Sequence, residues 1–245
     1  GIPFPVFARA AYGTIGSNLP ALMRALVACG WFGIQAWIGG EALQTLFAAL
    51  IPGWPQLLGA GFAGHSTTEW LSFLLFWSLN VFIIYRGMDL LRWVENWAAP
   101  FVLVMTAVLL VWAVRQANGL GPLLAQPGKL NTFREFFPVF MPSLTAMIGF
   151  WATLSLNIPD FTRYARSQRS QAVGQALGLP PTMTLFAFIG VAVTSATIVL
   201  FGEAIWDPVA VIARIGSPPV IILGTLIVVI AQLTTNMAAN VVSPA

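Results

Sequence analysis

The chain has 245 residues, of which 58% are apolar and only 8% are charged, and its net charge is +3. Ordinary soluble domains carry about 25% charged residues. Eleven basic and eight acidic side chains are therefore too few to cover a globule of this size with a solvated surface, which excludes a soluble enzyme. A single cysteine, Cys29, and a single histidine, His65, exclude an internal disulfide and a histidine-rich metal centre.

Long stretches without charges predict six membrane spans, because each holds the roughly 20 residues that cross a bilayer core of about 30 Å. In chain order these spans are 20–48, 70–86, 96–115, 136–160, 171–202 and 218–243. We therefore predict an all-α polytopic protein, with residues 1–245 forming a single transmembrane domain in the lipid bilayer of the cell membrane. The basic residues divide seven to four between alternate loops, with Arg24 in the larger set, which places both ends in the cytoplasm. This bias accounts for the positive charge, so no nucleic-acid partner is expected.

The first predicted span carries an aromatic side chain and an amide on one face. Trp31 and Gln35 are four residues apart, so both point into the same space. An indole stacks on flat rings, and a carboxamide both donates and accepts hydrogen bonds. Together they suit a planar heterocycle with amide-like edges. The alternative is an interfacial tryptophan beside a glutamine that bonds a neighbouring helix.

The fourth predicted span has the pattern of an interrupted helix. Pro138, Pro142, Gly149 and Pro159 punctuate it, and an aromatic pair follows Gly149 directly. Broken membrane helices are tolerated where the freed backbone lines a cavity or a binding site. The alternative is a helix that is merely kinked near the membrane interface.

The sixth predicted span contains a cluster of uncharged polar residues. The carbonyl of Ala231 and the hydroxyls of Thr234 and Thr235 are hard oxygen ligands of the kind that hold an alkali cation. Asn236 and Asn240, again four apart, are placed to read a polar ligand. In the alternative interpretation the threonines bond to their own helix and the asparagines join helices.

Several segments of the chain resemble the nucleobase:cation symporter-1 family, whose members are permeases for cytosine, purines, uracil, allantoin, thiamine and hydantoins. They are GIPFPVFAR at 1–9, NLPAL at 18–22, WFGIQ at 31–35, LNIPDFTRY at 156–164 and the segment 235–245. The resemblance implies a leucine-transporter-like fold of twelve helices with a five-plus-five inverted repeat, in which this chain is an internal fragment with helices three to eight. It also implies that the first helix, with further cation ligands, lies outside the chain, so that the fragment alone should not transport.

The resemblance further implies which residues bind. The implied substrate residues are Trp31, Gln35, Gly149, Phe150, Trp151 and Asn240, and the implied sodium ligands are Ala231, Thr234 and Thr235. In the family pattern, Trp31 and Trp151 stack on opposite faces of the substrate, with Gly149 or Phe150 flanking Trp151. Gln35 and Asn240 bond the substrate edges.

These observations predict a secondary active transporter that imports a nucleobase or related planar heterocycle, such as allantoin, uracil, cytosine or hydantoin, across the plasma membrane. The coupling ion is Na⁺ or H⁺, and no cofactor is expected. The chain is not an enzyme, because no pair of acidic residues is placed for acid–base work. No phosphate-binding glycine loop of the Walker type occurs, which argues against ATP-driven transport. The alternative is a membrane channel or receptor-like protein without coupled transport, and no oligomeric state is predicted.

Overall fold

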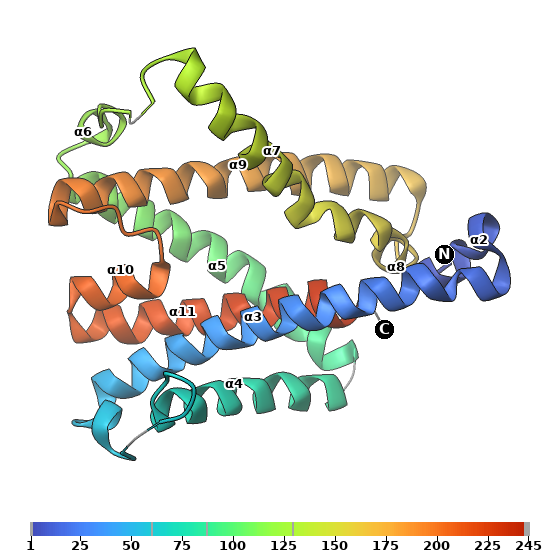
Figure 1. The fold of residues 1–245 in the computed structure, drawn as a ribbon, viewed down its shortest axis with the longest axis horizontal. Helices are drawn as coiled ribbons and strands as arrows, with labels where there is room; N and C mark the ends of the chain where they lie inside the picture. Colours follow the sequence, from blue (N-terminus) through green and yellow to red (C-terminus); the bar gives the residue numbers. More distant parts are fainter. Residues whose placement is uncertain (1, 60, 87, 129, 243–245) are drawn as a thin grey trace.

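A computed structural model of the chain describes residues 2–59, 61–86, 88–128 and 130–242. Within these ranges the side chains of 88–92, 95, 151–155 and 242 are left out of the description. Every named element in the described residues is helical, as the sequence predicts (Figure 1). The helices are α1 (Phe4–Phe7), α2 (Arg9–Gly16), α3 (Asn18–Leu50), η1 (Trp54–Gln56), α4 (Thr67–Arg86), α5 (Met88–Gln116), α6 (Leu120–Leu124), α7 (Phe133–Leu156), α8 (Ile158–Thr162), α9 (Gln168–Phe201), α10 (Pro208–Ile215), α11 (Pro218–Asn236) and the π-helical η2 (Met237–Val242).

The long helices coincide with the predicted spans. Among the described residues, five helices are long and apolar enough to cross a membrane: α3, α4, α5 from residue 96, α9, and α11 with η2 as far as Val241. The segment predicted as the fourth span, 136–160, forms α7 and the short α8, and its crossing of the membrane stays a prediction. In Figure 1, α3 lies beside α4 and α11, and α5 joins α11 to α9.

Helix α4 shows why an apolar chain folds into a bundle in a membrane. Its buried residues recur at helical spacing, and three of them are polar: Thr68, Ser72 and Asn80. Its exposed faces carry large apolar side chains instead, for example Trp77 and Phe82. A helix with polar groups inside and apolar groups outside suits lipid, because every buried polar group must find its partner within the protein.

Close approach of α3 and α4 depends on two adjacent glycines. A Cβ atom at Gly39 would lie 2.3 Å from the ring of Phe76, and one at Gly40 would lie 2.7 Å from the backbone of Phe73. Small residues let membrane helices pack backbone to backbone, since van der Waals contact supplies much of the attraction there. The fully buried Phe76 therefore fits against the bare backbone of α3.

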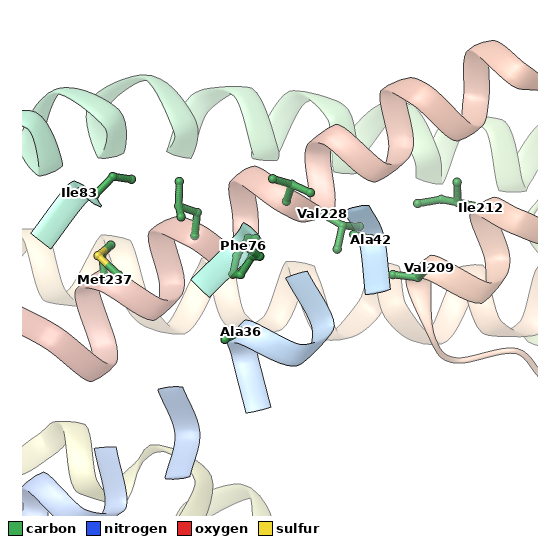
Figure 2. Packing of buried hydrophobic residues seen from close by; sticks show 10 residues of the cluster. Ala36, Ala42, Phe76, Ile83, Val209, Ile212, Val228 and Met237 are labelled. Carbon is green, nitrogen blue, oxygen red and sulfur yellow. The ribbon is translucent and has the colours of Figure 1, made fainter. Parts of the chain in front are cut away.

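Two clusters of buried apolar residues hold the bundle together. The first joins α3, α4, α10, α11 and η2 around Phe76, Val228 and Met237, as Figure 2 shows. The second joins α5, α6, α9 and α10. The short helix α10 contributes to both clusters, with Ile212 in the first and Val211 in the second. This connecting helix, which Asp207 caps by accepting a hydrogen bond from the Val209 amide at 2.9 Å, was not predicted from the sequence.

The helix break in the fourth predicted span lies elsewhere than expected. Helix α7 continues through Pro138, Pro142 and Gly149 and ends at Leu156. The break falls at Asn157, whose φ and ψ of −98° and 1° are not helical. Pro159 sits in the first turn of α8, where its missing N–H costs no hydrogen bond, so it begins a helix rather than ending one. The prediction that the prolines and Gly149 interrupt this segment was therefore wrong in position.

Candidate functional site

Helix α3 places Trp31 and Gln35 one turn apart, and both side chains are half-buried. The indole of Trp31 meets the ring of Phe150 edge to face, with ring centroids 5.0 Å apart and an interplanar angle of 82°. This contact brings α7 to α3. The carboxamide oxygen Oε1 of Gln35 is buried and accepts no hydrogen bond among the described residues. An unsatisfied buried acceptor costs about 1–3 kcal/mol, so this oxygen is open to a donor from beyond the described residues.

On α7, the predicted residues are only partly described. Gly149 and Phe150 are exposed, and a Cβ atom at Gly149 would meet nothing within 4 Å in the described part of the chain. Trp151 lies in α7, and its side chain is outside the described residues. The stacking of a ring between Trp31 and Trp151 therefore stays a prediction, whereas the contact of Trp31 with Phe150 is observed.

Asn240 lies in the π-helical segment η2, directly after α11. Its side chain is buried, and Nδ2 donates a hydrogen bond of 2.9 Å to Oδ1 of Asn236. A π-helical turn is wider than an α-helical one and is frequently found at functional sites. The assembly of Asn240, Trp31 and Gln35 into one site is a proposal, taken up below.

The predicted cation ligands lie on the last turns of α11. The hydroxyl of Thr234 donates to the carbonyls of Ile230 at 3.0 Å and of Ala231 at 3.1 Å, which is the back-bonded arrangement of the alternative interpretation. Thr235 is exposed. The described residues contain no group of three or more His, Cys, Asp or Glu side chains that could hold a metal ion. A cation bound here would therefore be held by neutral carbonyl and hydroxyl oxygens, some of them from other helices.

Arg24 is a residue of this region that sequence reasoning misplaced. It was counted with the cytoplasmic loops, but it lies inside α3 and is only 4% exposed. Its Nε donates to Oδ1 of Asn157 at 3.2 Å, and its Nη2 donates to the carbonyl of Ala239 at 2.7 Å. It therefore joins α3 both to the helix break and to the π-helical segment. The signal in the sequence is its position seven residues, two helical turns, before Trp31.

Asp160 completes this end of the bundle. Its carboxylate is 3% exposed, and Oδ1 accepts a hydrogen bond of 3.0 Å from the backbone amide of Phe4. The first turn of the chain is thereby attached to α8.

The fold and these contacts define a multi-pass helical membrane protein. The chain belongs to the family described as permeases for cytosine/purines, uracil, thiamine and allantoin, whose family model matches residues 1–245. The resemblance found in the sequence is thus confirmed.

Two curated relatives match with 46% identity. One is the allantoin permease of Bacillus subtilis (strain 168), with 100% of this chain and 50% of the relative covered, and the other is the purine-uracil permease NCS1 of Arabidopsis thaliana, with 100% and 41% covered. The chain therefore spans about half the length of these relatives.

A solved structure shares the fold. It is that of Mhp1, a nucleobase-cation-symport-1 family transporter, in a closed conformation with bromovinylhydantoin bound. The TM-score is 0.73 at 26% identity, over 99% of this chain and 51% of Mhp1. The match confirms the predicted all-α, leucine-transporter-like fold class.

Proposed function

We propose that the protein containing this chain is a secondary active transporter that imports a planar nucleobase-like compound, allantoin or a uracil-like ring, across the cell membrane. The observation that carries the proposal is the buried Oε1 of Gln35, which has no hydrogen-bond partner among the described residues and lies one helical turn from Trp31 on α3. A ring stacked on the indole would bring an N–H group to that oxygen. The names of the relatives, which are permeases for allantoin and for purines and uracil, support the same class of substrate.

In this proposal Trp31 contributes affinity by stacking, and Gln35 contributes selectivity by hydrogen bonding. Aromatic stacking on a base contributes about 1–3 kcal/mol, which corresponds to about 5- to 150-fold in affinity. Stacking is tolerant of ring identity, because every base has a π-face. Gln35 supplies the selectivity, since a ligand without a matching donor would leave a buried oxygen unpaired.

The test is uptake of radiolabelled allantoin, uracil, cytosine, hydantoin and thiamine by cells that express the full-length protein. Trp31→Ala and Gln35→Ala are expected to abolish uptake at unchanged expression. Trp206→Ala is the matched control, because Trp206 is 83% exposed in the loop before α10. Wild-type uptake by both site variants would refute the assignment of the site.

We further propose that a cation gradient drives uptake and that Ala231, Thr234 and Thr235 hold the cation. The lone pairs of two hydroxyls and a carbonyl within one turn are suitable ligands for sodium. Uptake is measured with a sodium gradient, with a proton gradient, and with each gradient dissipated. Thr235→Ala is expected to raise the sodium concentration for half-maximal uptake, and an unchanged sodium response would remove this site.

A channel or receptor is the competing function. It predicts that the labelled compound never accumulates above its external concentration, whatever the gradient. If the labelled compound accumulates above its external concentration, and this accumulation is lost when the cation gradient is dissipated, the protein is a transporter and not a channel or receptor.

A further inference from the structure

Helices α3 and α11 pack against each other, and each carries a glutamine whose side-chain oxygen lacks a partner. Oε1 of Gln35 on α3 and Oε1 of Gln232 on α11 are both buried, and neither accepts a hydrogen bond among the described residues. Both side chains are half-buried. Turning either amide around would put its NH₂ group in the place of the oxygen, so an unpaired polar group stays buried in both orientations.

The register of α3 against α11 follows from one hydrogen bond. Nη2 of Arg24 donates to the carbonyl of Ala239 at 2.7 Å, and α3 and α11 run in opposite directions in Figure 1. Seven residues, about two turns, lead forward along α3 from Arg24 to Trp31, and seven residues lead back from Ala239 to Gln232. Gln232 therefore lies level with Trp31 and one turn from the level of Gln35.

The apolar cluster between these helices shows that they stay together over this distance. Ala36, the residue after Gln35, belongs to the same cluster as Val228 and Met237. Figure 2 shows Ala36 between the levels of Val228 and Met237, and Gln232 lies between those two residues in the sequence. Side chains on a helix lean toward its N-terminus. Because the two helices are antiparallel, the side chains of Gln35 and Gln232 lean toward each other's level.

The same register brings the other predicted site residues to this place. Asn240 follows Ala239 directly, so it lies at the level of Arg24, about two turns from Gln232. The side chain of Trp31 leans from the level of Gln232 toward that of Asn240. A ring stacked on this indole would have Asn240 toward one edge and the two glutamines toward the other.

We propose that Gln232 is a substrate-binding residue, which shares one edge of the stacked ring with Gln35 while Asn240 bonds the opposite edge. This inference rests on the proposed function, in which Trp31 and Gln35 hold a planar nucleobase-like compound. It adds a contact from α11 for which sequence spacing gave no indication. The ligand is then a ring with hydrogen-bonding groups on both edges, as in uracil and allantoin.

The test compares ligand affinity with the stability of the ligand-free protein in Gln232→Met. Methionine is also unbranched, and it removes both polar atoms of the amide. Dissociation constants of radiolabelled allantoin and radiolabelled uracil are measured on purified full-length protein, and the apparent Tm is measured without ligand. Gln232→Met should weaken binding about tenfold or more, because the ligand loses a buried partner. Its apparent Tm without ligand should equal or exceed that of wild type, because an unsatisfied buried oxygen has been replaced by an apolar group.

The two measurements separate a ligand contact from a structural residue. If Gln232 bonds another part of the full-length protein, Gln232→Met loses that bond and lowers the apparent Tm without ligand. Gln116→Met is the matched control, because Gln116 is exposed at the end of α5, and it should change neither quantity. Gln35→Met should show the same pair of responses as Gln232→Met.

Each outcome decides between the inference and its failure. Unchanged dissociation constants in Gln232→Met overturn the inference, and so does a lower apparent Tm without ligand or failure of this variant to fold. If Gln35→Met weakens binding in the same measurement, the proposed function stands even then. If neither variant weakens binding, the assignment of the site in the proposed function fails as well. If wild type binds neither labelled compound, the proposed substrate class fails, and this inference with it.

Discussion

Substitution of Gly40 tests whether the contact between α3 and α4 is as close as the structure shows. A Cβ atom at Gly40 would lie 2.7 Å from Cα and 3.0 Å from the amide nitrogen of Phe73, well short of the 3.4–4 Å of ordinary contact. Both atoms belong to the backbone, so no side-chain rotation relieves the overlap. In Gly40→Ala the two helices must separate, and insertion of extra atoms into a packed interior costs about 1–3 kcal/mol.

The assay is thermal unfolding of the detergent-solubilised full-length protein, followed by size-exclusion chromatography. Gly40→Ala should lower the apparent Tm, by less than the roughly 2–4 °C per kcal/mol that applies to chains of 150–250 residues, because the entropy of unfolding grows with chain length. Gly33→Ala on the same helix is the control, because its Cβ would meet nothing within 4 Å in the described residues. Gly33→Ala should equal wild type or gain up to about 1 kcal/mol from the higher helix propensity of alanine. Equal stability of Gly40→Ala and Gly33→Ala would refute the reasoning.

Two further predictions concern the buried charged residues. Arg24→Leu should lower the free energy of unfolding by about 1.5–3 kcal/mol for each hydrogen bond lost, and Arg24→Lys should not restore it, since an ammonium lacks the fork that reaches both Asn157 and Ala239. Wild-type thermal stability in Arg24→Leu would contradict this. Asp160→Ala should speed hydrogen exchange at the amide of Phe4 about tenfold or more, because its acceptor is removed. Unchanged exchange at that amide would show that α1 is held by other contacts.

The long helices were predictable because a helix that crosses a membrane needs a long apolar run without charges. The predicted span 171–202 corresponds to α9 at Gln168–Phe201, and 70–86 corresponds to α4 at Thr67–Arg86. Each boundary lies where charged or turn-forming residues end an apolar run. The break at Asn157 was missed because a proline favours the first turn of a helix as readily as it ends one, and the sequence alone does not distinguish the two.

The sequence could place site residues together only where they lie within one helix. Trp31 and Gln35 share one helical face by their spacing, so their proximity needed no tertiary information. The bond between Asn80 and Asn236 joins residues 156 positions apart, and no spacing rule predicts such a pair. The contact of Trp31 with Phe150 likewise depends on how α7 is placed against α3.

Arg24 bonds α3, which the sequence predicted, to two irregular segments that it did not predict. A guanidinium inside a membrane helix needs partners at its own level, and the described residues contain no ion pair for it. Its partners are instead the side chain of Asn157, at the break after α7, and the carbonyl of Ala239, within the π-helical turn of η2. Each partner lies where the regular helical pattern is interrupted: Asn157 accepts through its side chain, and Ala239 accepts through a backbone carbonyl within the π-helical turn. The two irregular segments and the buried cation therefore depend on one another, and η2, the segment that carries Asn240, is held at the level that Arg24 sets.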